Sequence, residues 1–171
     1  MSHSISSPEE LRASYERIWS TTDMFETPDY YARCLDLAAP VAGERLLDVA
    51  CGGGYLLQEA GRRGLRLAGI DIADAAIARA QRMNPGADLR RAEAEALPFA
   101  DGSFDLVTCL GSLEHFLDPA AALEEIRRVL TPQGRAVLAI PNQFWAYDVA
   151  RGWIEGAALQ HGQEKEEFFS L

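Results

Sequence analysis

The 171-residue sequence contains no apolar run that approaches the roughly 20 residues needed to cross a membrane. It also contains no stripe of lysine and arginine, and its 26 acidic residues outnumber its 16 basic ones, which gives a formal net charge of −10 at pH 7. Its arginine pairs at 62–63, 90–91 and 127–128 are isolated and are expected to be solvated. Residues 1–7 are polar and lack the basic and then apolar order of a signal peptide. Because nucleic-acid binding draws on clustered positive charge, we expect neither a nucleic-acid partner nor membrane contact.

Cysteine is also scarce. The three cysteines have no paired spacing, which suits a reducing cytoplasm better than a disulfide framework. Two of them, Cys51 and Cys109, fall at the ends of predicted strands, where small buried residues are common. No group of cysteine, histidine and carboxylate residues has the spacing of a metal site. We therefore expect a cytoplasmic protein without a metal, and the length fits one domain.

What the chain does contain is a glycine turn near residue 50. Residues 46–49 form an apolar run broken by Asp48, as in a buried parallel strand. Contiguous glycines at 52–54 follow, and residues 55–60 have the composition of a helix. Glycines let a ligand approach the main chain, and the first turn of the next helix offers free N–H groups. A strand, a glycine turn and a helix in this order predict a ligand site.

An acidic residue after the second predicted strand indicates the class of ligand. Residues 65–70 form another apolar strand, and Asp71 follows it. An acid in this position can accept hydrogen bonds from both hydroxyls of a ribose, although a helix cap shared with Asp74 is an alternative. A dinucleotide site would carry Gly-x-Gly-x-x-Gly, whereas these glycines are contiguous and an acid lies inside the first strand. The first half of the chain therefore predicts a nucleoside site of another kind.

The string Asp48-x-x-Cys51-Gly52-x-Gly54 resembles the first motif of the class I S-adenosylmethionine-dependent methyltransferases. Further segments resemble that family in the same order, at 69–72, 92–99, 101–107, 113–119 and 130–134. The resemblance covers roughly residues 40–142 and is to the ubiquinone-biosynthesis and related small-molecule methyltransferases. It implies S-adenosylmethionine as the cofactor.

The pattern of elements predicts an α/β fold. Strands at 46–50, 66–70, 88–91, 104–110 and 135–140 alternate with helices at 54–62, 74–83 and 118–130. Right-handed crossovers then give a doubly wound, Rossmann-like parallel sheet with helices on both faces. The resemblance implies the strand order 3-2-1-4-5, with the crevice between the first and fourth strands. A turn at 132–134 is expected to separate the last helix from the fifth strand.

Three regions are expected, namely an N-terminal helical cap at 1–40, the cofactor-binding core at 41–142 and an aromatic lid or substrate segment at 143–171. Tyr15 and Trp19 share one face of the first helix, which either packs on the core alone or also covers the ligand. Members of the resembled family continue with two more strands, so strands 6 and 7 are expected to be missing. Either the chain is truncated, or another chain, as in a homodimer, covers the edge of the fifth strand.

The resemblance assigns most of the matched residues to the cofactor. The full set is Asp48, Ala50, Cys51, Gly52, Gly53, Gly54, Asp71, Ile72, Glu93, Ala94 and Leu110. The methionine part of the cofactor would pass over the glycine turn. Asp48 would orient this turn and reach the methionine ammonium, or, alternatively, would only cap its own loop. Asp71 would hold the ribose.

The remaining residues of this set would surround the adenine and the reactive end. Ile72 would pack on the adenine face, which is compatible with an ordinary core position. Glu93 would accept a hydrogen bond from the adenine amino group, unless it is a solvated acid, and Ala94 would offer its backbone N–H to the ring. The family often has Asp in place of Glu93, which makes the reach of this side chain one methylene longer. Leu110 would touch the cofactor near its reactive end, or be a buried strand residue.

Glu114 and His115 are the only polar pair expected to face the substrate. Histidine exchanges a proton near neutral pH, which suits a general base for a phenol, carboxyl or amine. In the alternative interpretation His115 orders the loop and Glu114 bonds to the backbone.

The sequence thus indicates methyl transfer to a small-molecule acceptor, by in-line attack of its oxygen, nitrogen or carbon on the sulfonium methyl. The loop after the fourth strand lacks both the Asn/Asp-Pro-Pro-aromatic motif of amino methyltransferases and the Pro-Cys nucleophile of cytosine-C5 enzymes. One alternative is a cofactor-binding module without catalysis. Another is a nucleotide-dependent oxidoreductase, in which Asp71 would bind the ribose equally well. The contiguous glycines and Asp48 count against this alternative.

Overall fold

The computed structural model describes residues 7–22 and 26–140 of the chain. Its elements in chain order are α1 (Pro8–Thr21), α2 (Pro28–Ala38), β1 (Arg45–Val49), α3 (Tyr55–Arg62), β2 (Arg66–Asp71), α4 (Asp74–Met83), β3 (Asp88–Arg91), β4 (Phe104–Leu110), the 3₁₀ turn η1 (Leu113–His115), α5 (Pro119–Val129) and β5 (Leu130–Ala139). Two helices begin as their sequences predict, with a capping side chain and then proline. Ser7 accepts the N–H of Glu10 at the start of α1, and Asp118 accepts that of Ala121 at the start of α5.

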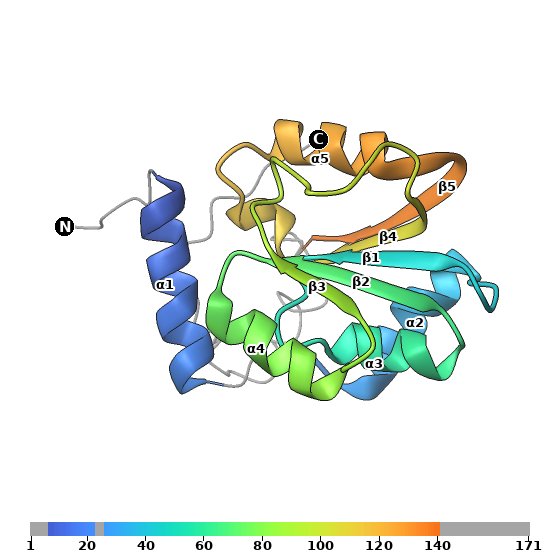
Figure 1. The fold of residues 1–171 in the computed structure, drawn as a ribbon, viewed down its shortest axis with the longest axis horizontal. Coiled ribbons are helices and arrows are strands. Elements are labelled where there is room, and N and C mark those ends of the chain that lie inside the picture. Colours follow the sequence, from blue (N-terminus) through green and yellow to red (C-terminus); the bar gives the residue numbers. More distant parts are fainter. Residues whose placement is uncertain (1–6, 23–25, 141–171) are drawn as a thin grey trace, which may run out of the picture.

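The strands form one sheet in the order β3-β2-β1-β4-β5, and every neighbouring pair is parallel. Figure 1 shows α2, α3 and α4 on one face of the sheet and α5 on the other. The predicted doubly wound α/β fold and its strand order are therefore confirmed. The order of the strands reverses between β1 and β4, so the loops that leave these two strands diverge and open a crevice at their carboxyl ends.

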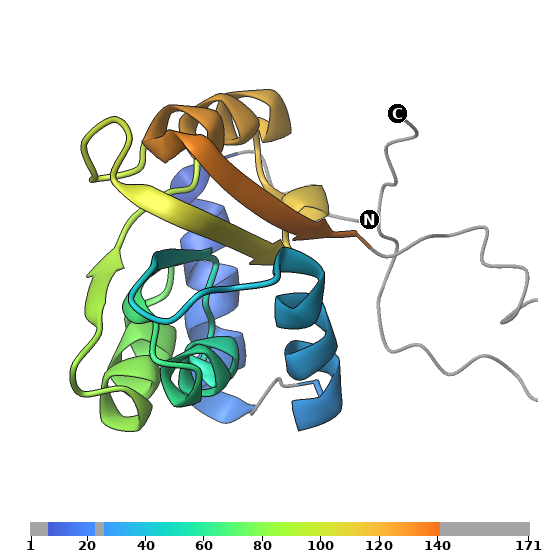
Figure 2. The same ribbon diagram turned by 90° about the vertical axis from the view of Figure 1, so that its right-hand side faces the viewer.

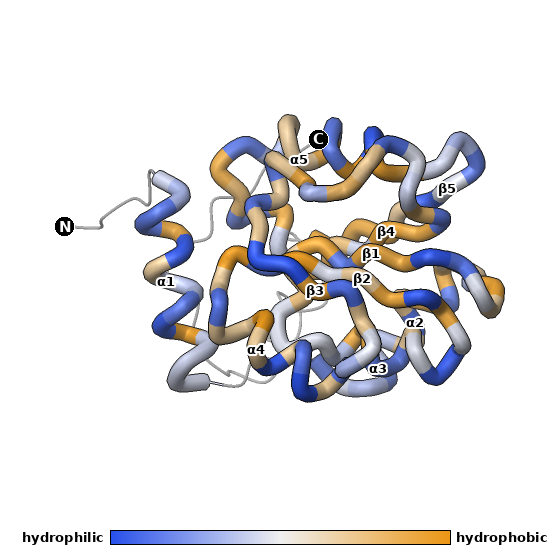
Figure 3. Tube along the Cα trace, in the orientation of Figure 1, coloured by the Kyte–Doolittle hydropathy of each residue, from blue (hydrophilic) through white to orange (hydrophobic). Residues whose placement is uncertain are grey.

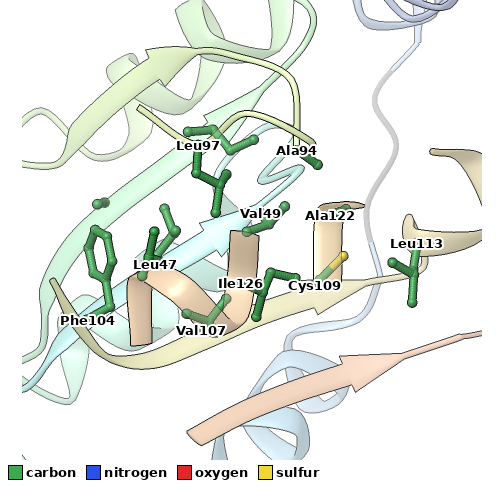
Figure 4. Packing of buried hydrophobic residues seen from close by; sticks show 13 residues of the cluster. Leu47, Val49, Ala94, Leu97, Phe104, Val107, Cys109, Leu113, Ala122 and Ile126 are labelled. Atoms are coloured by element: carbon green, nitrogen blue, oxygen red, sulfur yellow. The ribbon is translucent and has the colours of Figure 1, made fainter. Parts of the chain in front are cut away.

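Apolar side chains fill both faces of the central strands. On one face Leu47 and Val107 pack beneath Ile126 of α5 (Figure 4). On the other face Leu46 and Leu106 pack against α2 and α3. Successive residues of β1 and β4 thus enter two different cores, which explains why most residues of these strands are apolar and why much of both strands is orange in Figure 3.

The fifth strand differs from the prediction. β5 begins at Leu130, directly after α5, instead of after a turn at 132–134. Its pairing with β4 jumps from Phe104↔Leu130 to Leu106↔Arg135, so residues 131–134 form a bulge within the strand. Proline has no N–H for the ladder, and bulges accommodate such residues. Figure 2 shows β5, in orange, along the edge of the sheet away from β3.

The long connection between β3 and β4 is held by α5, and here the expectation of a solvated arginine is wrong for Arg128, whereas Arg62, Arg90, Arg91 and Arg127 are exposed. Arg128 donates to the carbonyl oxygens of Leu97 and Phe99 at 3.0 and 2.8 Å and to the Asp101 carboxylate at 2.8 Å. Glu125 accepts the N–H of Leu97 at 2.7 Å. Arg128 is therefore a structural residue that fixes the segment leading from the predicted adenine site back into the sheet.

Among the described residues, no helix combines the length and the apolarity that a membrane crossing requires. The predicted aromatic lid at 143–171 and the missing strands 6 and 7 concern a part of the chain outside the described residues. The edge of β5 is described, and a homodimer through it stays a prediction.

Candidate cofactor site

A cavity of about 460 Å³ lies over the carboxyl ends of β1, β2 and β4. This volume falls within the range of about 300–1,000 Å³ typical of small-molecule sites. The strand ends form its floor through Asp48, Asp71 and Leu110, while α1 and the start of α2 form its other side. In Figure 1, α1 stands across this end of the sheet. The crevice predicted at the reversal of strand order is therefore a real cavity.

The glycine turn forms one wall of the cavity and has an unusual backbone. Ala50, Gly52 and Gly54 have φ of 58°, 51° and 81°, the left-handed region that favours glycine. The N–H of Cys51 donates to the carbonyl oxygen of Ile70 at 2.8 Å and so ties the turn to β2. The turn leaves its backbone facing the cavity.

The structure does not bring Gly54 to the cavity, although the sequence predicts cofactor contact there. A Cβ at Gly54 would lie 2.5 Å from Nδ2 of Asn84 and 3.0 Å from Cβ of Ala80. Asn84 also donates to the carbonyl oxygen of Gly54 at 2.9 Å. Gly54 therefore allows α3 to start close against α4, which is a packing role.

Asp71 is placed as the sequence predicts for a ribose ligand. Its side chain lines the cavity, with the residue only 5% exposed. Oδ2 accepts the N–H of Gly52 and Oδ1 that of Ala73, both at 2.9 Å. A carboxylate has about four acceptor positions, so Asp71 can still accept a hydrogen bond from a ligand. Burial raises the pKa of Asp71 to about 6, and the N–H bonds oppose this rise.

The alternative role of Asp71 and Asp74 as a shared helix cap is not what the structure contains. The N-cap of α4 is Ala73, which has no side-chain cap. Asp74 instead pairs with Arg91 at 3.3 Å. In place of a local cap, Glu16 of α1 accepts the N–H of Ala75 at 3.1 Å.

Asp48 lies beneath the glycine turn and also lines the cavity. It is 4% exposed, and its Oδ1 accepts a 2.7 Å hydrogen bond from the hydroxyl of Thr108. Burial raises the pKa of Asp48 to about 7; the Thr108 bond opposes this rise and the nearby Asp71 charge adds to it. The sequence did not indicate Thr108 as a site residue, because it lies inside the strand predicted at 104–110. The register of the parallel strands β1 and β4 would have indicated it, because that register places Thr108 opposite Asp48.

The predicted adenine residues come together at one end of the cavity. Ile72, Glu93 and Ala94 all line it. Ala94 is buried and Glu93 is exposed. The N–H of Ala92 donates to the carbonyl oxygen of Asp71 at 3.0 Å, which holds this segment beside β2. The geometry is compatible with the adenine prediction, and the individual contacts remain predictions.

The predicted reactive end of the site follows β4. Leu110, Glu114 and His115 line the cavity together. Nε2 of His115 is 3.9 Å from Oε1 of Glu114, and the Glu114 side chain is only 2% exposed against 30% for His115. The ring of Tyr15 packs edge-on against His115 with centroids 6.2 Å apart. A buried carboxylate beside an accessible imidazole is an arrangement that can hold and move a proton.

Sequence analysis also missed an aromatic wall. Tyr31 stacks on Tyr55 with centroids 6.3 Å apart and planes 8° apart, and Tyr30 meets Tyr31 edge-on at 5.6 Å. All three tyrosines line the cavity, as does Trp19 of α1. The indole lies so close to the turn that a Cβ at Gly52 would be 2.5 Å from it. Helical spacing indicated Trp19, whereas Tyr30 and Tyr31 of α2 and Tyr55 of α3 showed no pattern in the sequence.

Cysteine and metal chemistry find no support among the described residues. Cys34, Cys51 and Cys109 are free and buried, and burial raises the pKa of each thiol. The expectation that Cys51 and Cys109 are small buried residues agrees with this. No group of three or more potential metal ligands occurs in residues 7–22 and 26–140.

The charge of the cavity indicates a cationic ligand. The described lining includes six carboxylates, Glu26, Asp48, Asp71, Glu93, Glu95 and Glu114, and a single histidine, but no lysine or arginine. Buried carboxylates require a counter-charge or hydrogen bonds. A ligand with a positive group over the turn and a ribose at Asp71 would satisfy both, and S-adenosylmethionine carries an ammonium, a sulfonium and a ribose.

Comparison with known proteins identifies the family. A family model described as a methyltransferase domain matches residues 47–138. The ubiquinone biosynthesis O-methyltransferase of Pseudomonas aeruginosa (strain UCBPP-PA14) is 38% identical over 114 residues, which cover 64% of this chain and 49% of that protein. That of Aromatoleum aromaticum is 34% identical over 153 residues, covering 82% and 65%. The chain thus spans about half the length of most of the curated relatives it matches.

Solved structures agree with the sequence relatives. The crystal structure of the YcgJ protein from Bacillus subtilis has a TM-score of 0.62 and 27% identity, and the match covers 66% of this chain and 50% of that one. Because the methyltransferase model matches more than half of the sequence, from the first core strand to the last, this chain belongs to the class I S-adenosylmethionine-dependent methyltransferase family.

Proposed function

We propose that this chain binds S-adenosylmethionine in the cavity and transfers its methyl group to a small-molecule acceptor. The observation that carries the proposal is the pair of buried carboxylates, Asp48 and Asp71, at the ends of adjacent strands with no cationic residue in the described lining. Asp71 would accept the ribose hydroxyls and Asp48 the methionine ammonium. When bound, the cofactor supplies an activated methyl group, so the protein's task is to hold the acceptor in line and to exclude water.

The acceptor would enter between Leu110 and the aromatic wall. His115 is the group that could remove a proton from an acceptor hydroxyl or amine, and Glu114 would stabilise the protonated imidazole. The described cavity has no arginine or lysine to neutralise an anion, which favours an acceptor that is neutral or cationic. The similar proteins of Pseudomonas aeruginosa and Aromatoleum aromaticum are O-methyltransferases, which favours oxygen as the attacking atom.

A binding module without catalysis is the second candidate, in which the chain would bind the cofactor and methylate no acceptor. Turnover separates the two candidates. We would incubate the chain with methyl-labelled S-adenosylmethionine and a matched panel of catechol, 3,4-dihydroxybenzoate and dopamine, which share a reacting hydroxyl and differ in charge. Labelled product from the neutral or cationic members, reduced about 100-fold in His115→Gln, is the expected result. Cofactor binding without product from any acceptor would favour the binding module.

A further inference from the structure

A buried hydrogen bond joins the two central strands under the glycine turn. Thr108 of β4 is fully buried, and its hydroxyl donates to Oδ1 of Asp48 on β1 at 2.7 Å. The two residues lie directly opposite each other in the parallel register. The other Asp48 oxygen makes no hydrogen bond to a described residue. The hydroxyl therefore fixes the side chain of Asp48 through one oxygen and leaves the second for a ligand.

The groups around Asp48 supply no positive charge. Asp71 on β2 is a second carboxylate, and Cys51 of the turn, Cys109 of β4 and Cys34 of α2 are thiols whose pKa values are raised by burial. The Thr108 hydroxyl is then the one described side chain that stabilises the ionised form of Asp48. Any cationic partner must come from the ligand.

We propose that Thr108 is a positioning residue for the cofactor's ammonium group, acting through Asp48. Its hydroxyl holds the carboxylate in a single orientation, with the second oxygen available to the cavity, and keeps that carboxylate ionised when the ligand arrives. This inference rests on the proposed function, because the ammonium is that of S-adenosylmethionine or of its product, S-adenosylhomocysteine.

The hydroxyl makes a specific contribution that packing alone would not. A charge-assisted hydrogen bond from a hydroxyl stabilises a carboxylate but not its protonated form to the same extent. Removing it at constant shape therefore shifts the pH at which Asp48 ionises, and with it the pH at which the ammonium is bound. A purely structural role for Thr108 would weaken binding at every pH alike.

Isosteric and conservative variants separate these roles. Thr108→Val keeps the shape and removes the donor, Thr108→Ser keeps the donor, and Thr131→Val in the β5 bulge is the matched control. S-adenosylhomocysteine binding is measured by calorimetry from pH 5.5 to 8.5. In the ligand-free protein, the ionisation of Asp48 is followed by NMR of ¹³C-labelled aspartate carboxyls, with the Asp48 signal assigned from Asp48→Asn.

In Thr108→Val we expect the ionisation midpoint of Asp48 to rise by about one pH unit or more, and binding at pH 7 to weaken about 10-fold. Thr108→Ser should restore both, and Thr131→Val should change neither. An unchanged midpoint, uniform weakening at all pH values or failure of serine to restore binding would overturn the proposal. If the wild-type chain binds no S-adenosylhomocysteine while the NMR midpoint still responds to valine, the proposed function fails and the hydrogen bond has no ligand to serve.

Discussion

Two carboxylates, Asp48 and Asp71, are the residues on which the account depends. Each is held at the end of a central strand, at most 5% exposed, by donors that come from neighbouring elements. Their pKa values are raised because burial disfavours the charged form more than these donors favour it. The two buried carboxylates make the ligand-free protein less stable than neutral residues in their place would. Ligand binding can offset this cost of burying the carboxylates.

The raised pKa values predict how the stability of the ligand-free protein depends on pH. The pKa of Asp48 is about 7 in the folded protein and has an ordinary value of 3.8. Between these values the unfolded chain releases a proton that the folded protein retains, so the free energy of unfolding falls as the pH rises from about 4 to 7. In Asp48→Asn this fall should be smaller, with the remaining part due to Asp71. Urea unfolding at several pH values measures the slope. Asp29→Asn, at an exposed site, is the control, and an equal slope in Asp48→Asn and wild type would contradict the argument.

At this scale the sequence predicted positions better than interactions. It indicated Asp48 and Asp71 because acids at the ends of apolar strands are conspicuous. It missed Thr108 and Arg128, because their partners are 60 and about 30 residues away in the chain. Only the strand register and the packing of α5 bring those partners together.

The element that closes the cavity is α1, which contacts three parts of the site from one face. Tyr15 packs on His115, Trp19 lies over Gly52, and Glu16 accepts the N–H of Ala75 in the first turn of α4. Tyr15 and Glu16 are each a helical neighbour of Trp19, four and three residues before it. The sequence left open whether this helix only packs on the core or also covers the ligand. Tyr15 and Trp19 line the cavity, which supports a helix that covers the ligand.

Glu16 should control how firmly α1 is attached. Glu16→Ala removes the only side-chain cap of α4 among the described contacts and should lower the free energy of unfolding by about 1 kcal/mol. It should also speed amide hydrogen exchange in α1, because the helix loses its bond to α4. Glu16→Gln keeps an acceptor oxygen and serves as the matched control. Exchange rates in α1 that are the same in all three proteins would rule out this attachment.

The close approach of α3 to α4 depends on Gly54, and a graded series of glycines tests this. Gly54→Ala combines a positive φ with a contact of 2.5 Å, Gly102→Ala has a positive φ in open space, and Gly86→Ala has neither. We expect losses in the free energy of unfolding of about 2–5, 1–2 and less than 0.5 kcal/mol respectively. Thermal unfolding monitored by circular dichroism gives this order. Equal losses at Gly54 and Gly102 would show that packing against α4 is unimportant.

Element boundaries followed from the sequence where local signals were strong. Capping residues and prolines predicted the starts of α1 and α5, and β4 was predicted at its observed bounds, Phe104–Leu110. The start of β5 was wrong because a proline and a glycine in sequence resemble a turn. Pairing of Leu130 with Phe104 extends the strand past them as a bulge, and this is a tertiary effect.

At the scale of the molecule, the described residues arrange their charges differently at the two ends of the sheet. At the amino ends of the strands, Arg45 pairs with Asp105 and Arg135 pairs with Glu44. These four side chains are partly exposed. At the carboxyl ends the cavity collects carboxylates and no arginine or lysine in its described lining. The sequence showed the net charge of −10 but not this separation. An acidic cavity at the carboxyl ends of the strands is suited to bind a cationic ligand.

Titration with S-adenosylhomocysteine tests the central claim most directly, namely that this cavity is a cofactor site. Calorimetry at pH 7.5 should give one site of micromolar affinity in the wild-type chain. Asp71→Ala should weaken it at least 10- to 100-fold, whereas Asp74→Ala, which alters an exposed neighbour, should bind as wild type. NADH should not bind. The account would be contradicted if a wild-type chain, shown by circular dichroism to be folded, did not bind S-adenosylhomocysteine. Tight binding of NADH in place of S-adenosylhomocysteine would also contradict it.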